Sequence, residues 1–282
     1  MASITTPKIT AEKQFYDSSK RNFRPLQEIK DAWHYRDLVF FLVQRDITAR
    51  YKRSALGIAW TMLNPLGMMI ILAIVFSEVF RITIEGYPAY VLSALIAWTF
   101  FSQTSSNTIS TLVWGGDLLQ RIYIPRSTFA ISAIGTGLVN LILSMVPLVL
   151  VNLFIGIPLH ATLLLSPFVM IFLAMFSLGI GLLISTIGIY FADVVEMYQI
   201  VLSAWFYITP IIYPLDVLPQ NIQAWLRFNP TVHLINLFRD LVFVGTIPPI
   251  QNWLLCLLIS SATLLLGWLV FTGKADEFAY RT

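Results

Sequence analysis

The residues of this 282-residue chain that could do chemistry are few, and they do not form a catalytic set. His34, His160 and His233 stand far apart, without the close spacing typical of a metal site. The single cysteine, Cys256, lies in an apolar run and has no partner for an intrachain disulfide. The sequence has no glycine-rich phosphate loop ending in Lys-Ser or Lys-Thr. We therefore expect no enzyme activity, no metal and no cofactor in this chain.

One pair of carboxylates is close in sequence. Asp193 and Glu196 have the spacing of a helix N-cap and the residue that completes its capping box. A contact with a cytoplasmic partner is the other structural interpretation. A membrane-embedded transferase is one possible function for such a chain, and it would need a carboxylate or metal cluster near a membrane face. This pair is the one that comes close to that requirement.

A cluster of positive charges precedes the first long apolar run, in QRDITARYKRSALG (residues 44–57). The cations are Arg45, Arg50, Lys52 and Arg53. At about 100° per residue, an apolar stripe lies on another side of the same helix. The stripe consists of Phe40, Val43, Ile47 and Tyr51. This pattern favours an amphipathic helix along a membrane interface, with its cations toward anionic headgroups. A plain topogenic anchor is the alternative, because positive charge before a first span is expected anyway.

The composition is that of an integral membrane protein. It is 57% hydrophobic and 12% charged with a mean hydropathy of +0.75, whereas soluble domains have about 25% charged residues. With so few charges, the net charge of +3 does not indicate a nucleic-acid partner. Six runs are long enough to span a bilayer. They are Ala59–Phe80, Tyr90–Leu112, Thr128–Ile157, Leu163–Phe191, Val194–Tyr213 and Trp253–Phe271. The sequence predicts an all-α membrane protein with six transmembrane helices.

The distribution of Lys and Arg predicts the orientation. Fifteen of the 18 fall on one side if the N-terminus is inside, so both termini are expected in the cytoplasm. The expected domains are a cytoplasmic tail at 1–32, a transmembrane domain at 33–275 and a short cytoplasmic tail at 276–282.

The second predicted span carries an unusual polar run from Ser102 to Thr111, including Gln103 and Asn107. Such a helix cannot face lipid tails comfortably. It is expected to face other helices or a wet cavity. No span has a charged residue or histidine near its middle, which disfavours ion-driven transport. Small residues at four-residue spacing, such as Ser177 and Gly181, predict close helix packing.

The cytoplasmic turn between the second and third spans reads as a glycine break followed by a short helix that Asp117 caps and Pro125 ends. Its residues Leu118, Leu119, Ile122 and Tyr123 are apolar. An exposed apolar helix rimmed by charge indicates a protein partner, and packing against the bundle is the alternative.

On the outer side, the segment between the fifth and sixth spans predicts two short helices with a break. Asn229 and Pro230 suit the N-cap and first turn of the second helix, which Gly245 ends. Trp205, Phe206 and Tyr207 lie just below this element. They suit interfacial anchoring or stacking against a sugar.

Four stretches in this order resemble the membrane subunit of ABC-2 type polysaccharide exporters, which carry lipid-linked O-antigen, teichoic acid or related glycans. They are QRDITARYKRSALGIAWTMLNPL (44–66), LLQRIYIPRSTFAIS (118–132), FADVVEMYQIVLSAWFYITPIIYPLDVLP (191–219) and NPTVHLINLFRDLVFVG (229–245). The resemblance runs from about Trp33 to the C-terminus. It departs at Ala192, where many relatives carry arginine before the aspartate.

The resemblance implies a homodimer in the cytoplasmic membrane, bound to two copies of a separate ATPase that holds ATP and Mg. Residues 35–53 would form an interfacial helix that draws the carrier headgroup to Arg45, Arg50, Lys52 and Arg53. The coupling helix at 115–125 would dock on the ATPase through Asp117, Leu118, Leu119, Arg121, Ile122 and Tyr123. Trp60, Asn64, Trp205, Phe206 and Tyr207 would line a channel. Outer gate helices at 216–245 would include Trp225, Asn229, Pro230, Leu237 and Phe238.

The exported substrate is therefore expected to be a lipid-linked polysaccharide. An ABC-2 exporter of a small drug or lipid is the nearest alternative, and a carrier-lipid transferase is the more distant one.

Overall fold

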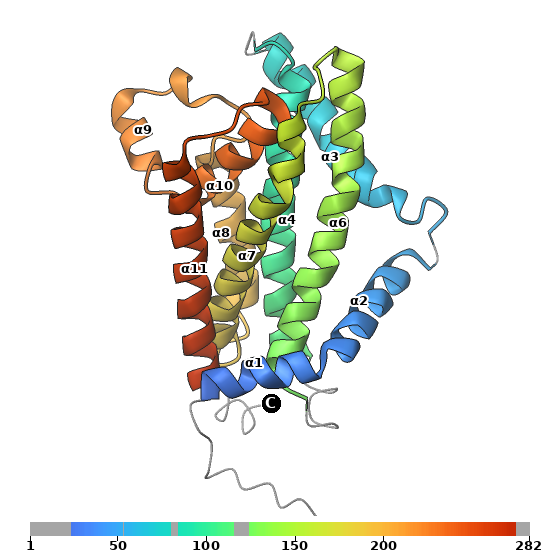
Figure 1. The fold of residues 1–282 in the computed structure, drawn as a ribbon, viewed down its shortest axis with the longest axis vertical. Coiled ribbons are helices and arrows are strands. Elements are labelled where there is room, and N and C mark those ends of the chain that lie inside the picture. The colour runs from blue at the N-terminus through green and yellow to red at the C-terminus, as the bar shows by residue number, and fades with distance from the viewer. Residues whose placement is uncertain (1–23, 53, 80–83, 116–123, 275–282) are drawn as a thin grey trace, which may run out of the picture.

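The computed structural model describes residues 24–52, 54–79, 84–115 and 124–274. The regular elements in these ranges are all helices, and they form an elongated bundle (Figure 1). The helices are α1 (Arg24–His34), α2 (Arg36–Tyr51), α3 (Ala59–Ile74), α4 (Tyr87–Trp114), α6 (Arg126–Ile155), α7 (Ser166–Gly188), α8 (Val194–Ile208), α9 (Gln220–Leu226), α10 (Pro230–Arg239) and α11 (Ile250–Gly273). Short 3₁₀ turns η3 (Ala161–Leu165) and η4 (Leu215–Val217) and π turns η2 (Val75–Val79) and η5 (Asp240–Val244) join them.

Each of the six predicted spans overlaps a helix, so the all-helical class is confirmed over the described ranges. Four stretches are apolar and long enough to cross a membrane: Ala59–Ser77, Arg126–Ile155, Ala161–Gly188 and Ile250–Gly273. Helix α4 has 28 residues but carries the polar run, and α8 has only 15. The polar face of α4 and the shortness of α8 make these two the unusual helices of the bundle.

Two predicted features of the α8 region are wrong in detail. The helix ends at Ile208 rather than Tyr213, because Thr209 precedes Pro210 and takes an extended conformation (φ −85°, ψ 134°). Asp193 stands at the N-cap position of α8, but its side chain makes no capping hydrogen bond.

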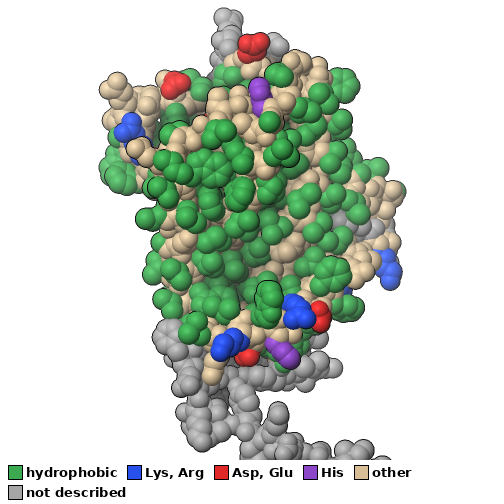
Figure 2. Space-filling model, viewed as in Figure 1, with side chains coloured by type: hydrophobic (Ala, Val, Ile, Leu, Met, Phe, Trp, Pro, Cys, Tyr) green, Lys and Arg blue, Asp and Glu red, His purple; other side chains and the backbone are tan. Residues whose placement is uncertain are grey.

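Helix α4 lies at the centre of the bundle and contacts α3, α6, α7, α8 and α10. Its Trp98 and Phe101 pack edge-to-face with each other and with Trp205 of α8. In Figure 2 the visible face is largely hydrophobic, and charged side chains gather near the two ends and beside the α2–α3 connection. This arrangement is typical of a protein whose middle section faces the hydrocarbon core of a membrane.

Helices α1 and α2 depart from the sequence prediction. Residues 24–34, most of which were assigned to the N-terminal tail, form α1, which lies across one end of the bundle (Figure 1). The indole Nε1 of Trp268 donates to the carbonyl of Pro25 (3.0 Å), and Ser127 Oγ donates to Glu28 Oε2 (2.7 Å). These bonds fasten α1 to α11 and to the start of α6.

The predicted apolar stripe of α2 does not act as one face. Leu42 is buried in the contact with α6, and Val43 packs over Gly135, whereas the ring of Phe40 is 72% exposed. An exposed apolar stripe is found on α1 instead. It consists of Leu26, Ile29 and Trp33.

Small residues set the closest helix contacts, as the sequence predicted. A Cβ on Gly267 of α11 would overlap the backbone oxygen of Gly179 on α7, and a Cβ on Gly179 would meet the backbone of Thr263. Gly181 similarly lets α7 approach Thr108 of α4. Backbone atoms cannot swing aside as a flexible side chain does, so α7 and α11 must separate if either glycine gains a side chain.

Replacing Gly267 by alanine is therefore expected to destabilise the folded protein by about 1–3 kcal/mol, the usual cost of overpacking. Thermal unfolding of the detergent-purified protein measures the effect as a lowered Tm. Gly67→Ala is the matched control, because its Cβ would meet nothing within 4 Å. Equal Tm values for the two variants would contradict the close contact.

Candidate functional site

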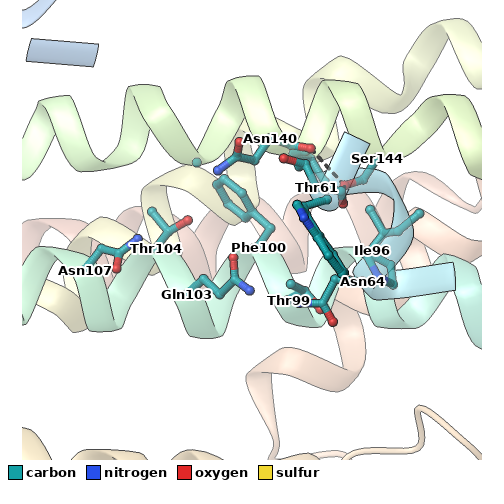
Figure 3. Close-up of a pocket in the computed structure, with 14 residues that line it drawn as sticks. Thr61, Asn64, Ile96, Thr99, Phe100, Gln103, Thr104, Asn107, Asn140 and Ser144 are labelled. Carbon is teal, nitrogen blue, oxygen red and sulfur yellow. Dashed lines mark hydrogen bonds between the residues drawn. The ribbon is translucent and has the colours of Figure 1, made fainter. Parts of the chain in front are cut away.

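The candidate site is a polar groove at mid-height of the bundle, built by α3, α4, α6 and α8. It consists of two adjoining cavities of about 270 and 530 Å³. Both are lined by Asn64, Pro65, Thr99, Gln103 and Asn107, so they adjoin along this shared wall. Figure 3 shows side chains from α3, α4 and α6 converging on the first cavity.

The polar groove is uncharged. Among the described residues that line it, there is no Asp, Glu, Lys, Arg or His. The polar lining residues are Thr61, Asn64, Thr99, Ser102, Gln103, Thr104, Ser106, Asn107, Asn140, Ser144, Gln199, Ser203 and Tyr207. Amides and hydroxyls both donate and accept hydrogen bonds. The groove therefore suits a neutral, hydroxyl-rich ligand better than an ion.

Helical periodicity divides the polar run of α4 between two roles. Thr99, Gln103 and Asn107, four residues apart, face the groove. Ser105 and Thr108 are fully buried, and their hydroxyls donate back to the carbonyls of Phe101 (2.7 Å) and Thr104 (2.9 Å). Helix α4 therefore packs against other helices on one side and lines the groove on the other, so both environments predicted for this span occur.

Pro65 shapes the α3 wall of the groove. It is buried inside the helix and has no N–H to donate to the carbonyl of Thr61, four residues earlier. Ser144 Oγ of α6 donates its one hydrogen mainly to the carbonyl of Asn140 (2.9 Å), and the carbonyl of Thr61 lies 3.4 Å away as a second, weaker acceptor. The proline thereby supplies a site where α6 is joined to α3 at the edge of the groove.

The predicted channel residues separate into two groups. Trp60, Asn64, Phe206 and Tyr207 border the groove. Trp205 does not line it. Its indole Nε1 donates to Asn229 Oδ1 (2.9 Å), and its ring packs among aromatic residues of the core. Sequence position alone could not show which of three consecutive aromatics turns inward.

The two short helices predicted between the fifth and sixth spans are present as α9 and α10, at the end of the bundle opposite α1 (Figure 1). Asn229 caps α10 as predicted, accepting from the backbone N–H of Thr231 (3.1 Å). Its Nδ2 donates to Thr209 Oγ1 (3.1 Å), which ties α10 to the end of α8. Leu237 and Phe238 are buried in the core, whereas Trp225 is 78% exposed on α9.

Arg239, at the end of α10, is a residue whose role the sequence did not reveal. It is buried and its guanidinium lies 3.8 Å from the centre of the Tyr90 ring. Nη2 donates to the carbonyls of Pro210 (3.2 Å) and Ile211 (3.3 Å), and Nη1 donates to Asn236 Oδ1 (3.3 Å). Arg239 thus holds the break between α8 and α9.

Several predicted site residues cannot be compared with the structure. Asp117, Leu118, Leu119, Arg121, Ile122 and Tyr123 lie outside the described residues, as do Arg53 and the side chain of Arg50. Arg45 bonds its neighbour Asp46 (Nη2 to Oδ1, 2.8 Å), and Lys52 is exposed. Within the described ranges, no group of three or more His, Cys, Asp or Glu side chains could hold a metal.

Comparison with known sequences identifies the family. Residues 37–243 match the model of the ABC-2 type transporter membrane domain. This chain belongs to the ABC-2 type transporter family. The matched region contains α2 to α10 and therefore the whole polar groove, while α1 and α11 lie beyond it.

Curated relatives of this ABC-2 chain are export permeases. It is 27% identical over 253 residues to the O-antigen export system permease protein RfbA of Myxococcus xanthus, covering 89% of this chain and 97% of the relative. It is 27% identical over 222 residues to the protein of the same name from Klebsiella pneumoniae, with coverage of 75% and 82%. The polysialic acid transport protein KpsM of Escherichia coli is 26% identical over 241 residues, with coverage of 83% and 92%.

Proposed function

We propose that this chain is the permease subunit of an ATP-driven ABC transporter that exports a lipid-linked polysaccharide across the cytoplasmic membrane. The observation that carries the proposal is the uncharged polar groove with aromatic rims formed by Trp60, Phe206 and Tyr207. Sugars stack on aromatic faces and hydrogen-bond to amides and hydroxyls. The family and the names of the relatives support the same substrate class.

In this proposal the six helices α3, α4, α6, α7, α8 and α11 all cross the membrane. Helix α4 tolerates its polar face because the groove covers it. Helix α8 would extend only about 22 Å, short of the bilayer core of about 30 Å. The turn after Thr209, together with α9 and α10, completes the outer half of that crossing. The α1 end would then be cytoplasmic, with both termini inside.

The working assembly would be two copies of this chain with two copies of a separate ATPase. The polar groove is open beside α3 and α8, where Met68, Ile200 and Tyr207 are exposed. A second copy at this edge would close the groove into a channel. Because the sequence has no phosphate loop, ATP and Mg would bind on the partner, which would dock at the cytoplasmic turn containing Leu118 and Leu119.

Cells that lack this chain but retain its ATPase are expected to make the polysaccharide and accumulate it inside, as measured by fractionation and glycan blotting. Wild-type complementation should restore surface polymer. The double variant Leu118→Asp/Leu119→Asp should reach the membrane but neither co-purify with the ATPase nor restore export, since it places two charges on the apolar docking face.

Loss of polymer synthesis, rather than accumulation, would point to the transferase alternative. Retained co-purification of the double variant with the ATPase would overturn the docking assignment alone.

A further inference from the structure

The seam between helices α3 and α6 is lined by polar side chains along one part of its length and by apolar side chains along another. At mid-height, Asn64 of α3 and Asn140 and Ser144 of α6 line the polar groove. Closer to the α9 end, a separate cavity of about 460 Å³ opens between the same two helices and the start of α4. The residues that line it are all apolar: Leu66, Met69, Ile70, Ala73, Ile74, Pro88, Pro147, Leu150, Val151, Phe154 and Ile155.

The change from polar to apolar falls at the same level on both helices. On α3, Pro65 lines the polar groove and the next residue, Leu66, lines the apolar cavity. On α6, the change lies within one turn, between Ser144 and Pro147. The Ser144–Thr61 hydrogen bond joins the helices at this level. The two spaces therefore adjoin end to end along one seam.

The apolar cavity faces the surroundings of the bundle rather than its core. Met69 and Pro147 are buried at its floor, while Ile74 and Leu150 are more than half exposed at its mouth. A cavity lined only by apolar groups does not hold ordered water. In a membrane, the material that reaches such a mouth is hydrocarbon.

We propose that this apolar seam holds a section of the hydrocarbon chain of the lipid-linked substrate while its polar head and first sugars occupy the polar groove. The inference rests on the proposed function. A polar head inside the bilayer needs hydrogen-bonding partners, and its chain needs an apolar surface. The α3–α6 seam offers both surfaces in register, with a lateral mouth through which the chain stays in contact with the bilayer.

A photocrosslinking experiment tests the occupant directly. A diazirine analogue of leucine is placed at position 150, in the seam, or at position 171 on α7, which is outside it. Leu150 and Ile171 are matched in exposure, at 52% and 53%. The complex with the ATPase is irradiated in membranes from cells that make the polymer and from cells that do not.

Adducts at position 150 are expected to contain the glycan-linked lipid several-fold more often than those at 171, and to lose it in cells without polymer. Equal labelling of ordinary phospholipid at both positions would overturn the proposal, because the seam would then hold only bulk lipid. Crosslinks to a second copy of this chain would overturn it as well.

A second variant separates this proposal from the proposed function. Ala73→Trp fills the seam, and Ile171→Trp places the same indole side chain on α7, outside the seam. Export should fall several-fold in the first variant alone, with normal folding and normal co-purification with the ATPase. Unchanged export in Ala73→Trp would defeat the seam assignment and leave the function standing, provided that deletion of the chain still abolishes export. Export that survives deletion would defeat both.

Discussion

Replacing Arg239 by methionine is expected to abolish export, because the connection between α8 and α9 loses the hydrogen bonds that hold it in place. The guanidinium donates to the carbonyls of Pro210 and Ile211 and to the side chain of Asn236. The two carbonyl contacts are buried, and leaving each of these acceptors without a donor costs about 1–3 kcal/mol. The change also leaves the neighbouring carboxyl of Asp240 without that nearby cation. The combined loss is a large share of the stability of a typical folded protein.

The matched control is Arg227→Met, which removes an exposed cation just after α9 and should leave stability and export unchanged. Arg239→Lys should fall between the two, since an ammonium keeps the charge but cannot reproduce the planar fork of a guanidinium. Size-exclusion profiles and Tm values in detergent measure stability, and surface polymer measures export. Normal Tm and export in Arg239→Met would show that the bonds to the α8–α9 break contribute little.

Sequence analysis predicted the positions of helices more reliably than the tertiary contacts of individual side chains. Apolar runs located the helices α3, α4, α6, α7, α8 and α11, and local chemistry located the cap at Asn229, because both depend on residues near each other in the chain. The role of Arg239 depends on Tyr90, far away in sequence, and on carbonyls exposed by a helix break. The packing of α10 against α4 brings these partners together, and no local sequence pattern predicts it.

Predicting which face of a helix is buried has the same limit, because it too depends on residues far away in sequence. The stripe of α2 was inferred from periodicity, but periodicity cannot say whether an apolar side chain meets lipid or protein. Leu42, outside the predicted stripe, is the residue buried against α6, and Phe40 within the stripe is exposed. The polar residues of α4 were recognised as abnormal for a span. Their division between packing and groove required the positions of α3, α6 and α8.

The double variant Gln103→Met/Asn107→Leu is expected to lower export while leaving assembly intact. Both amides line the two cavities of the groove and come from the central helix. Losing one net hydrogen bond to the glycan at each position costs about 1–3 kcal/mol together, which corresponds to a decrease on the order of tenfold to a hundredfold. The substituted side chains are similar in size, so the groove keeps its width.

Thr111→Val is the matched control, because Thr111 is on the same helix but does not line the groove. Surface polymer is compared at equal amounts of assembled permease and ATPase, so that the comparison isolates transport. The double variant should also keep or raise its Tm, since apolar replacements remove polar groups from the membrane interior. A lowered Tm with proportionally lowered assembly would mean that the amides hold the bundle together. Full export by a stable double variant would mean that the glycan passes elsewhere.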